Sequence, residues 1–431
     1  MIPFGLQINS IRLKMSRSWL HIFVLSFTVL SLTTKPVNSY GLPATRPTCD
    51  RGPGYSKTTL SKFIPFHNAP TNIPPFTSSP SLSFALDDKI YNTTMDTGST
   101  GLLLAAAGLP GYDLEAAAKY PIGWQYFTSS NILQAGNWIP KRLSFLDANV
   151  TATVPVLAVT MSVICPWYNL SIDTDSCPTS PDGVTAVPTS MPTGIEYMGV
   201  GFGREYEGQP QGTPDKVTLL NIDSIDGQTL ENGCVIDGHK KSCLNEGYVI
   251  NKTGVSVGLT EENTKHFSFV KLTLNHSYSD DPRDWTQTPC CVSINGEVCS
   301  PGSVLLDTGI PQSYLTVPLS VPVNLEGSEL ADGVNVTVHF GSNGSYAAAY
   351  DFIVGGQGNE MAPTEVIVTQ SDAKSPFFNT GRHLYRDFDI LHDALGGYLG
   401  LRWRGNASLA LFGGTCVERG GESDGGQAFK S

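Results

Sequence analysis

Two Asp-Thr-Gly triplets contain the residues of this chain that are best suited to chemistry. The first begins at Asp96 and the second at Asp307 (307 − 96 = 211 residues later), and a strand-like run leads into each. Two carboxyl groups brought within about 3 Å cannot both ionise, so they share one proton. The ionised partner can then take a proton from a water molecule while the protonated partner stabilises a carbonyl oxygen. The triplets therefore indicate hydrolysis by an aspartate pair, without a metal or cofactor.

Short strands joined by turns are the elements that we expect to position these aspartates. Gly (44) and Pro (29) are frequent enough for many turns, and long amphipathic helical repeats are absent from the sequence. Strand composition is clear in residues 152–163, 249–259, 267–274 and 334–340, whereas residues 113–119 (DLEAAAK) predict a short helix. The repeat of a triplet after a domain's length predicts a mostly β protein of two similar halves.

The chain begins with the pattern of a secretory signal peptide. An apolar run of 14 residues, Trp19 to Leu32, follows Arg12, Lys14 and Arg17, and small residues follow at 37–39. The run is short for a membrane span, so we predict a cleaved signal at residues 1–39 and no stable membrane anchor. Residues 40–82 are rich in Pro, Ser and Thr and predict an extended or loosely ordered lead-in, and the Gly-rich residues 417–431 predict a flexible tail.

Cysteines, glycosylation signals and charge also favour a secreted protein. Three close pairs predict disulfides: Cys165 with Cys177, Cys234 with Cys243, and Cys290 or Cys291 with Cys299. Asn-X-Ser/Thr sequons begin at Asn92, Asn149, Asn169, Asn251, Asn275, Asn335, Asn343 and Asn406, as in glycoproteins. Without the four basic residues of the signal segment, 23 basic residues face 39 acidic ones, a net charge of −16. This charge disfavours nucleic acid as a partner.

The triplets and three further segments resemble the pepsin-like aspartic proteases. The segments are residues 195–203 (IEYMGVGFG), 247–272 and 377–403. The resemblance implies a mostly β, bilobal fold with an N-terminal lobe at 83–262, a C-terminal lobe at 263–416 and a cleft between them. It makes Asp96 and Asp307 catalytic, supported by Thr97, Gly98, Ser99, Thr308 and Gly309. It also implies a sheet shared by the chain ends, in which Cys49 and Cys416 would lie close enough to pair.

Two departures from the family pattern bear on catalysis. A hydroxyl residue normally follows each triplet and bonds the neighbouring carboxylate; Ser99 supplies it in the first copy, but Ile310 stands in the second. We expect the loss of that bond to raise the proton affinity of Asp307. The tyrosine of the family's substrate-covering flap is not recognisable. Tyr126 is a candidate, although an ordinary strand aromatic is the more frequent role for such a residue.

Two functions remain open. The first is a secreted aspartic-type endopeptidase, active as a monomer at acidic pH on peptide or protein substrates, with the medium, the cell wall or the vacuole as its destination. The second is a catalytically silent fold of the same kind that acts as a secreted binding module. Both aspartates favour the protease, whereas Ile310 and the missing flap tyrosine favour the binding module.

Overall fold

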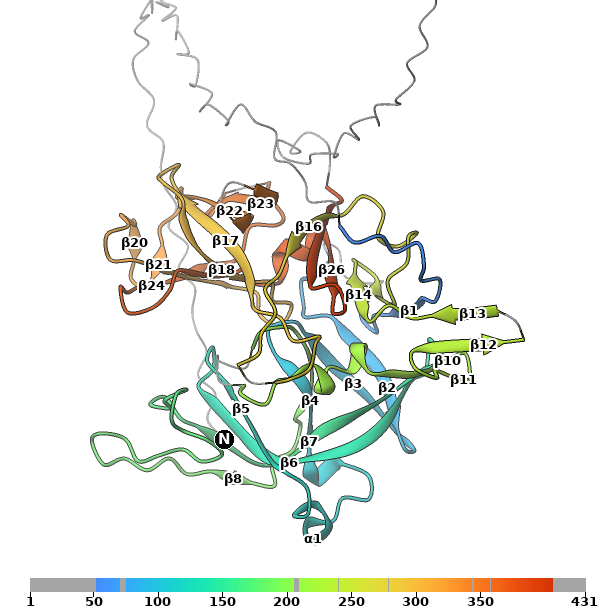
Figure 1. Cartoon of the computed structure of the whole chain (residues 1–431). Coiled ribbons are helices and arrows are strands. Elements are labelled where there is room, and N and C mark those ends of the chain that lie inside the picture. The colour runs from blue at the N-terminus through green and yellow to red at the C-terminus, as the bar shows by residue number, and fades with distance from the viewer. Residues whose placement is uncertain are drawn as a thin grey trace, which may run out of the picture. The chain divides into compact units, whose positions relative to one another are not determined.

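The computed structural model describes residues 52–69, 75–204, 209–238, 240–277, 279–342, 345–356 and 358–405. These residues belong to one unit, Pro47–Ser431, and most of their regular structure is β-strand (Figure 1). The predicted signal peptide at 1–39, the Cys49–Cys416 pair and the tail at 417–431 lie outside the described residues.

A sheet of ten strands contains the first triplet. Its order is β11-β10-β7-β4-β9-β3-β2-β6-β5, and β8 pairs with β7 at its side. The strands are β2 (Ser81–Leu86), β3 (Lys89–Asp96), β4 (Thr100–Ala105), β5 (Ile122–Phe127), β6 (Ile132–Phe145), β7 (Val150–Ile164), β8 (Thr189–Ser190), β9 (Glu196–Val200), β10 (Ile222–Ile225) and β11 (Gln228–Thr229). The predicted helix forms as α1 (Leu114–Ala117), and the Asp113 carboxylate caps it by accepting from the Ala116 amide.

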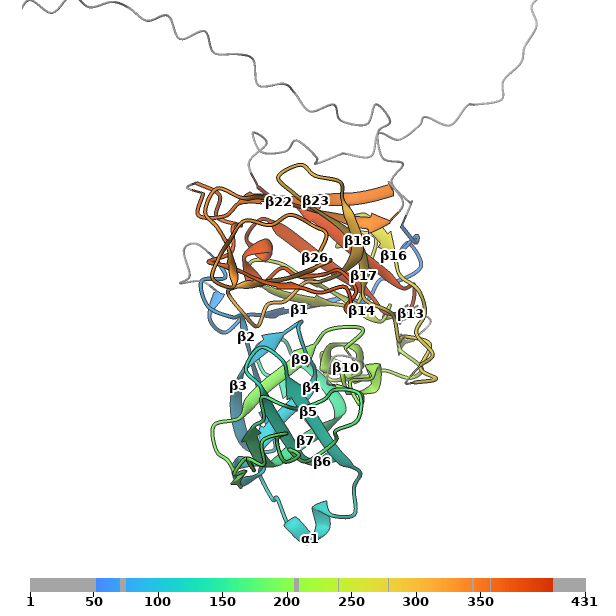
Figure 2. The same ribbon diagram turned by 90° about the vertical axis from the view of Figure 1, so that its left-hand side faces the viewer.

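The second triplet lies between strands of a nine-stranded sheet: two strands come before it in the sequence and seven come after it. The order of this sheet is β20-β21-β24-β19-β25-β18-β17-β22-β23, and Figure 2 shows β17, β18, β22 and β23 close together. The strands are β17 (Thr288–Ile294), β18 (Ser300–Leu305), β19 (Ser313–Val317), β20 (Leu325–Glu326), β21 (Glu329–Leu330), β22 (Asn335–Ser342), β23 (Ser345–Ile353), β24 (Val366–Gln370) and β25 (Phe377–Asn379). The strand composition at 334–340 therefore corresponds to β22.

A sheet of six strands is formed from segments far apart in the chain. Its order is β1-β15-β14-β26-β27-β16. The strands are β1 (Lys62–Pro65), β14 (Gly247–Ile250), β15 (Gly254–Val257), β16 (Ser268–Lys271), β26 (Phe388–Asp393) and β27 (Tyr398–Trp403). A separate hairpin joins β12 (Cys234–Asp237) to β13 (Lys240–Cys243), and short 3-10 helices lie at Ala106–Gly108, Pro214–Lys216, Thr218–Leu220 and Arg382–Arg386. The lobe boundary expected between residues 262 and 263 lies in the segment between β15 and β16, which both belong to this third sheet.

The lead-in is more ordered than its composition suggests. We expected residues 40–82 to be extended or loosely ordered, but residues 62–65 form β1 and pair antiparallel with β15. Tyr55, Ile64, Phe66 and Phe76 are all buried. Burial of these four large apolar side chains, together with the β1–β15 pairing, contributes to ordering the surrounding Pro- and Ser-rich chain.

One strand arrangement occurs twice and places the two triplets alike. In the ten-stranded sheet, β9 lies between β3 and β4, parallel to the first and antiparallel to the second. In the nine-stranded sheet, β25 lies in the same way between β18 and β19. Each triplet sits in the turn between the two outer strands. The repeat at 211 residues is therefore a structural repeat.

Three disulfides form between near neighbours. Cys165 pairs with Cys177, Cys234 with Cys243 and Cys291 with Cys299. These pairs confirm the predicted ones and select Cys291 over Cys290, which is buried and free in the described part of the chain. Disulfides of this kind are typical of proteins from oxidising compartments. Within the same described part, no helix is long and apolar enough to cross a membrane.

Candidate active site

The first aspartate lies at the end of a buried strand. Asp96 is the last residue of β3 and is opposite Gly199 of β9 in the parallel register. Its side chain is only 5% exposed. The chain turns immediately, and the Gly98 amide donates to Asp96 Oδ1 at 2.7 Å. This bond fixes the carboxyl group in the turn of its own triplet.

The second aspartate has the same local geometry. Asp307 follows β18 by two residues and is 6% exposed. The Gly309 amide donates to Asp307 Oδ1 at 2.7 Å, as the Gly98 amide does in the first turn. The two turns are therefore closely matched in conformation.

The two threonines join the triplets to each other. The Thr97 amide donates to Thr308 Oγ1 and the Thr308 amide donates to Thr97 Oγ1, both at 3.0 Å. The Thr97 hydroxyl donates to the carbonyl oxygen of Leu306 (2.5 Å), and the Thr308 hydroxyl donates to that of Met95 (2.8 Å). Both threonines are fully buried. This reciprocal set of bonds holds residues from two different sheets in one fixed position.

The two carboxyl groups face each other across the glycines of the triplets. A Cβ atom added to Gly98 would lie 2.5 Å from Asp307 Oδ2, and one added to Gly309 would lie 2.5 Å from Asp96 Oδ1 and 3.1 Å from Asp307 Oδ1. Only glycine leaves room for the carboxylates at these positions. Burial first, and then the negative charge of Asp307, raise the pKa of Asp96 from 3.8 to about 8. A buried pair in this state holds one proton near neutral pH.

Ser99 is close to Asp96 but poorly aligned with it. Its hydroxyl is buried and has no hydrogen bond of ordinary geometry among the described residues. The Ser99 hydroxyl lowers the pKa of Asp96 only through a weak contact, because a hydrogen bond weakens steeply when it is misaligned. Ser99 is a polar neighbour of Asp96 and not a well-directed donor.

Asp307 has a donor that the sequence did not reveal. Asn379, the last residue of β25, donates from Nδ2 to Asp307 Oδ2 at 2.7 Å, and the bond is buried. Ile310 supplies no hydroxyl bond, as expected, but Asn379 donates to Asp307 in its place. The side chain comes from a strand 72 residues further along the chain. The sequence reveals it only as a polar residue inside an apolar segment, Phe377–Phe378–Asn379.

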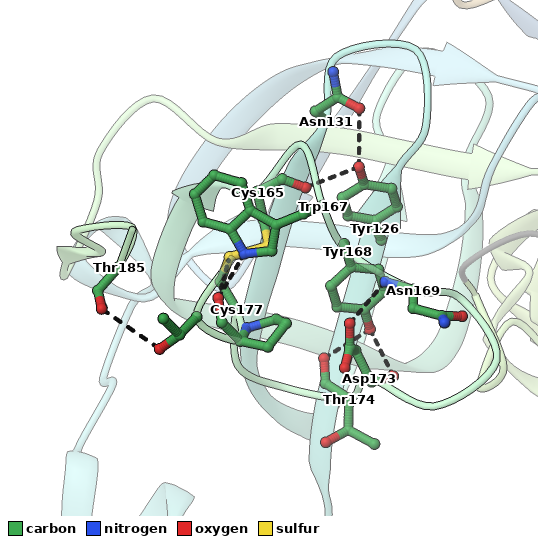
Figure 3. The surroundings of a disulfide bond; sticks show 12 residues. Tyr126, Asn131, Cys165, Trp167, Tyr168, Asn169, Asp173, Thr174, Cys177 and Thr185 are labelled. Carbon is green, nitrogen blue, oxygen red and sulfur yellow. Dashed lines mark hydrogen bonds between the residues drawn. A yellow bond between two sulfur atoms is a disulfide. The ribbon is translucent and has the colours of Figure 1, made fainter. Parts of the chain in front are cut away.

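Tyr126 packs against the loop closed by the Cys165–Cys177 disulfide (Figure 3). Its hydroxyl lies 2.9 Å from Asn131 Oδ1 and 3.0 Å from the carbonyl oxygen of Cys165. Its ring stacks on Tyr168 with the centroids 4.4 Å apart, and only 4% of the residue is exposed. Tyr126 is thus a structural aromatic near the turn of the β5–β6 hairpin, packed on the disulfide loop.

Two other tyrosines lie near the aspartates: Tyr385, whose hydroxyl lies 3.1 Å from Thr97 Oγ1, and Tyr197. Tyr197 lies in β9, opposite Thr94 of β3. Burial, followed by the charges of Asp96 and Asp307, raises the pKa of Tyr197. Its ring also makes an edge contact with Phe127, with the centroids 5.6 Å apart. Because side chains alternate along β5, Phe127 reaches this side of the hairpin while Tyr126 reaches the other.

The arrangement can polarise a water molecule between two carboxyl groups. Within the described residues, no group of three or more His, Cys, Asp or Glu side chains could hold a metal ion.

A comparison with protein-family models matched no family, and a comparison with curated proteins matched no relative. Neither comparison therefore identifies a family for this chain.

Proposed function

We propose that this protein is a secreted aspartic-type endopeptidase with the bilobal fold of the pepsin-like proteases. The observation that carries the proposal is the buried pair Asp96 and Asp307, held face to face by the reciprocal bonds of Thr97 and Thr308. Such an arrangement confines charge in a low-dielectric site. An aspartate that only formed a turn would need neither burial nor a partner carboxyl group. The substrate would be a peptide or protein bound in a cleft between the two lobes.

Asp96 is the partner that holds the proton in this proposal. Burial and the neighbouring Asp307 raise the pKa of Asp96 to about 8, so this carboxyl group is the one that keeps the shared proton. Asp307 takes a proton from a water molecule held between the carboxyl groups, and the oxygen of that water attacks the carbonyl carbon of the peptide bond. Asp96 donates its hydrogen bond to the carbonyl oxygen, on which negative charge develops. Asp307 then gives the proton that it took from the water molecule to the leaving nitrogen, and the C–N bond breaks.

A binding module without catalysis is the second candidate function. The observation that favours it is the state of Tyr126 and Ser99: the first is committed to a disulfide loop, and the second is not aligned with Asp96. A pepsin-like cleft can bind peptides by shape without cleaving them. The two candidates share one binding site and differ in whether the dyad is poised for catalysis.

Proteolysis of denatured globin or casein by the purified full-length secreted protein tests the proposal. The assay covers about pH 3 to pH 8, with and without a statine-type inhibitor. We expect cleavage that the inhibitor blocks, that falls as pH approaches about 8 because Asp96 loses its proton, and that drops at least about a thousandfold in Asp96→Asn and Asp307→Asn. Asp87→Asn is the matched control, since Asp87 is exposed and its backbone has a φ of 51°, which asparagine adopts readily.

Three results separate the candidates. Cleavage that survives in Asp96→Asn or Asp307→Asn would refute the dyad mechanism. No cleavage at any pH, together with calorimetric binding of the inhibitor, would identify the silent binding module. Absence of both from a protein with native circular dichroism would overturn the whole assignment.

A further inference from the structure

Asn379 is fixed at both ends of its amide group. Its Nδ2 donates to Asp307 Oδ2 at 2.7 Å, and its Oδ1 accepts from the Gly381 amide at 2.9 Å. The second bond determines which end of the amide points toward the aspartate, because a reversed amide would place two donors against each other. The residue is 7% exposed. Its amide therefore presents a directed N–H group to the carboxyl group and no acceptor.

The two halves of the structural repeat differ at this position. Asn379 of β25 lies opposite Leu305 of β18, and the corresponding residue of β9 is Tyr197, which lies opposite Thr94 of β3 (305 − 211 = 94). The strand that lies behind the aspartate thus carries a tyrosine in the first half and a directed amide donor in the second.

The second half is also the one in which the turn supplies no hydroxyl group. Ile310 follows the second triplet where Ser99 follows the first. The backbone bond is the same in both halves: the Ile310 carbonyl oxygen accepts from the Arg382 amide at 2.9 Å, and the Ser99 carbonyl oxygen accepts from the Gly201 amide at 2.8 Å. The apolar side chain of Ile310 offers no hydrogen bond to Asp307. The half of the repeat whose turn carries an apolar residue is thus also the half in which β25 supplies a hydrogen-bond donor.

We infer that Asn379 is a positioning residue of the aspartate pair, which replaces the missing hydroxyl donor and keeps Asp307 as the ionised partner. The inference rests on the proposed function, because it assigns a role to Asn379 within that site. A hydroxyl group can rotate to donate or to accept, but the Nδ2 group can only donate. Donation to a charged oxygen is stronger than donation to a neutral one. Asn379 therefore favours the state in which the shared proton resides on Asp96.

The alternative is that Asn379 only stabilises the turn at the end of β25 through Gly381. Asn379→Asp separates the two roles, since an aspartate keeps an acceptor for the Gly381 amide but replaces the donor with a third carboxyl group beside Asp307. Asn379→Ala removes both bonds. Ile310→Thr, combined with Asn379→Ala, restores a hydroxyl group in the turn and no bond to Gly381.

The experiment measures the pH dependence of kcat/KM, and the titration of the dyad by NMR of protein labelled with ¹³C at the aspartate carboxyl carbons. In Asn379→Ala and in Asn379→Asp we expect the lower apparent pKa of the dyad to rise by about one pH unit or more, with kcat at least about tenfold lower. The double variant should recover most of both changes. The matched control is Asn359→Ala, whose amide bonds the carbonyl oxygen of Asp351 at an exposed site and should change neither quantity.

Two results would overturn the inference. The first is an unchanged lower titration step of the dyad in both Asn379 variants, which would reduce the residue to a structural role. The second is the absence of any recovery in the double variant, measured on protein whose thermal unfolding shows it to be folded. If the wild-type protein cleaves nothing, the proposed function fails, but the NMR titration still tests whether Asn379 controls where the proton resides.

Discussion

His392 provides a sharp test of how burial governs the stability of this protein at acidic pH. The residue lies in β26 with its ring between Phe202 and Tyr248, at centroid distances of 5.1 and 4.9 Å. Neither ring nitrogen has a hydrogen-bond partner among the described residues. Burial lowers the pKa of His392 from 6.5 to about 3. The native state therefore holds this histidine neutral at pH values where an unfolded chain protonates it.

The sign and size of the effect follow from that difference. Below about pH 6.5 the unfolded chain binds a proton that the native state refuses, so stability is lost as pH falls, until the native residue also protonates near pH 3. From 6.5 down to about pH 4 is about 2.5 pH units at about 1.4 kcal/mol each. His392 should thus cost about 3 kcal/mol of unfolding free energy at pH 4 and almost nothing at pH 7.5.

His392→Phe removes this cost and keeps a ring between the two aromatic neighbours. Urea unfolding at about pH 7.5 and about pH 4 gives the stability difference between variant and wild type at each pH. We expect this difference to shift by about 3 kcal/mol in favour of the variant at the lower pH, whatever its value at the higher one. His67→Gln, at an exposed site, is the control and should shift by less than about 0.5 kcal/mol. A shift below about 1 kcal/mol in His392→Phe would refute the reasoning.

Two further predictions concern the scaffold of the site. Replacing Cys165 and Cys177 by alanine opens a loop with a sequence separation of 12 and should lower the free energy of unfolding by about 2–3 kcal/mol, measured in urea; a loss under about 0.5 kcal/mol would contradict this. Gly98→Ala places a Cβ atom 2.5 Å from the Asp307 carboxyl group and should abolish proteolysis, whereas Gly54→Ala meets nothing within 4 Å and should leave it unchanged. Equal activity of the two variants would show that the carboxyl groups are not packed against the triplet.

Local features of the molecule were accessible from the sequence. The short helix forms after Asp113 because a carboxylate at that position satisfies a free amide of the first turn, which is a signal contained within four residues. The disulfide between Cys234 and Cys243 joins partners in one hairpin, so its spacing already indicates the pair. The triplets are equally compact signals. Each of these predictions depends on residues that are close together in the chain.

Features that depend on contacts between distant strands could not be predicted from the sequence in the same way. Asn379 reaches Asp307 only because β25 inserts between β18 and β19, and no spacing rule connects the two residues. The face of β5 on which Tyr126 lies depends on strand register, and a shift of one residue would reverse it. The burial of aromatic residues in the lead-in was not visible in its linker-like composition, because it depends on packing against other strands. Tertiary contacts decided all three cases.

Asp96 and His392 change the free energy of unfolding with pH in opposite directions. A carboxyl group whose native pKa is raised loses stability as pH rises above its ordinary value of 3.8, whereas a histidine whose native pKa is lowered loses stability as pH falls below 6.5. Between these two values the slopes are equal and opposite, so the combined cost of the two groups is constant. Above pH 6.5 only the cost of Asp96 still grows, and below pH 3.8 only that of His392. The two groups are therefore tolerated best together at weakly acidic pH, where the dyad also holds its single proton.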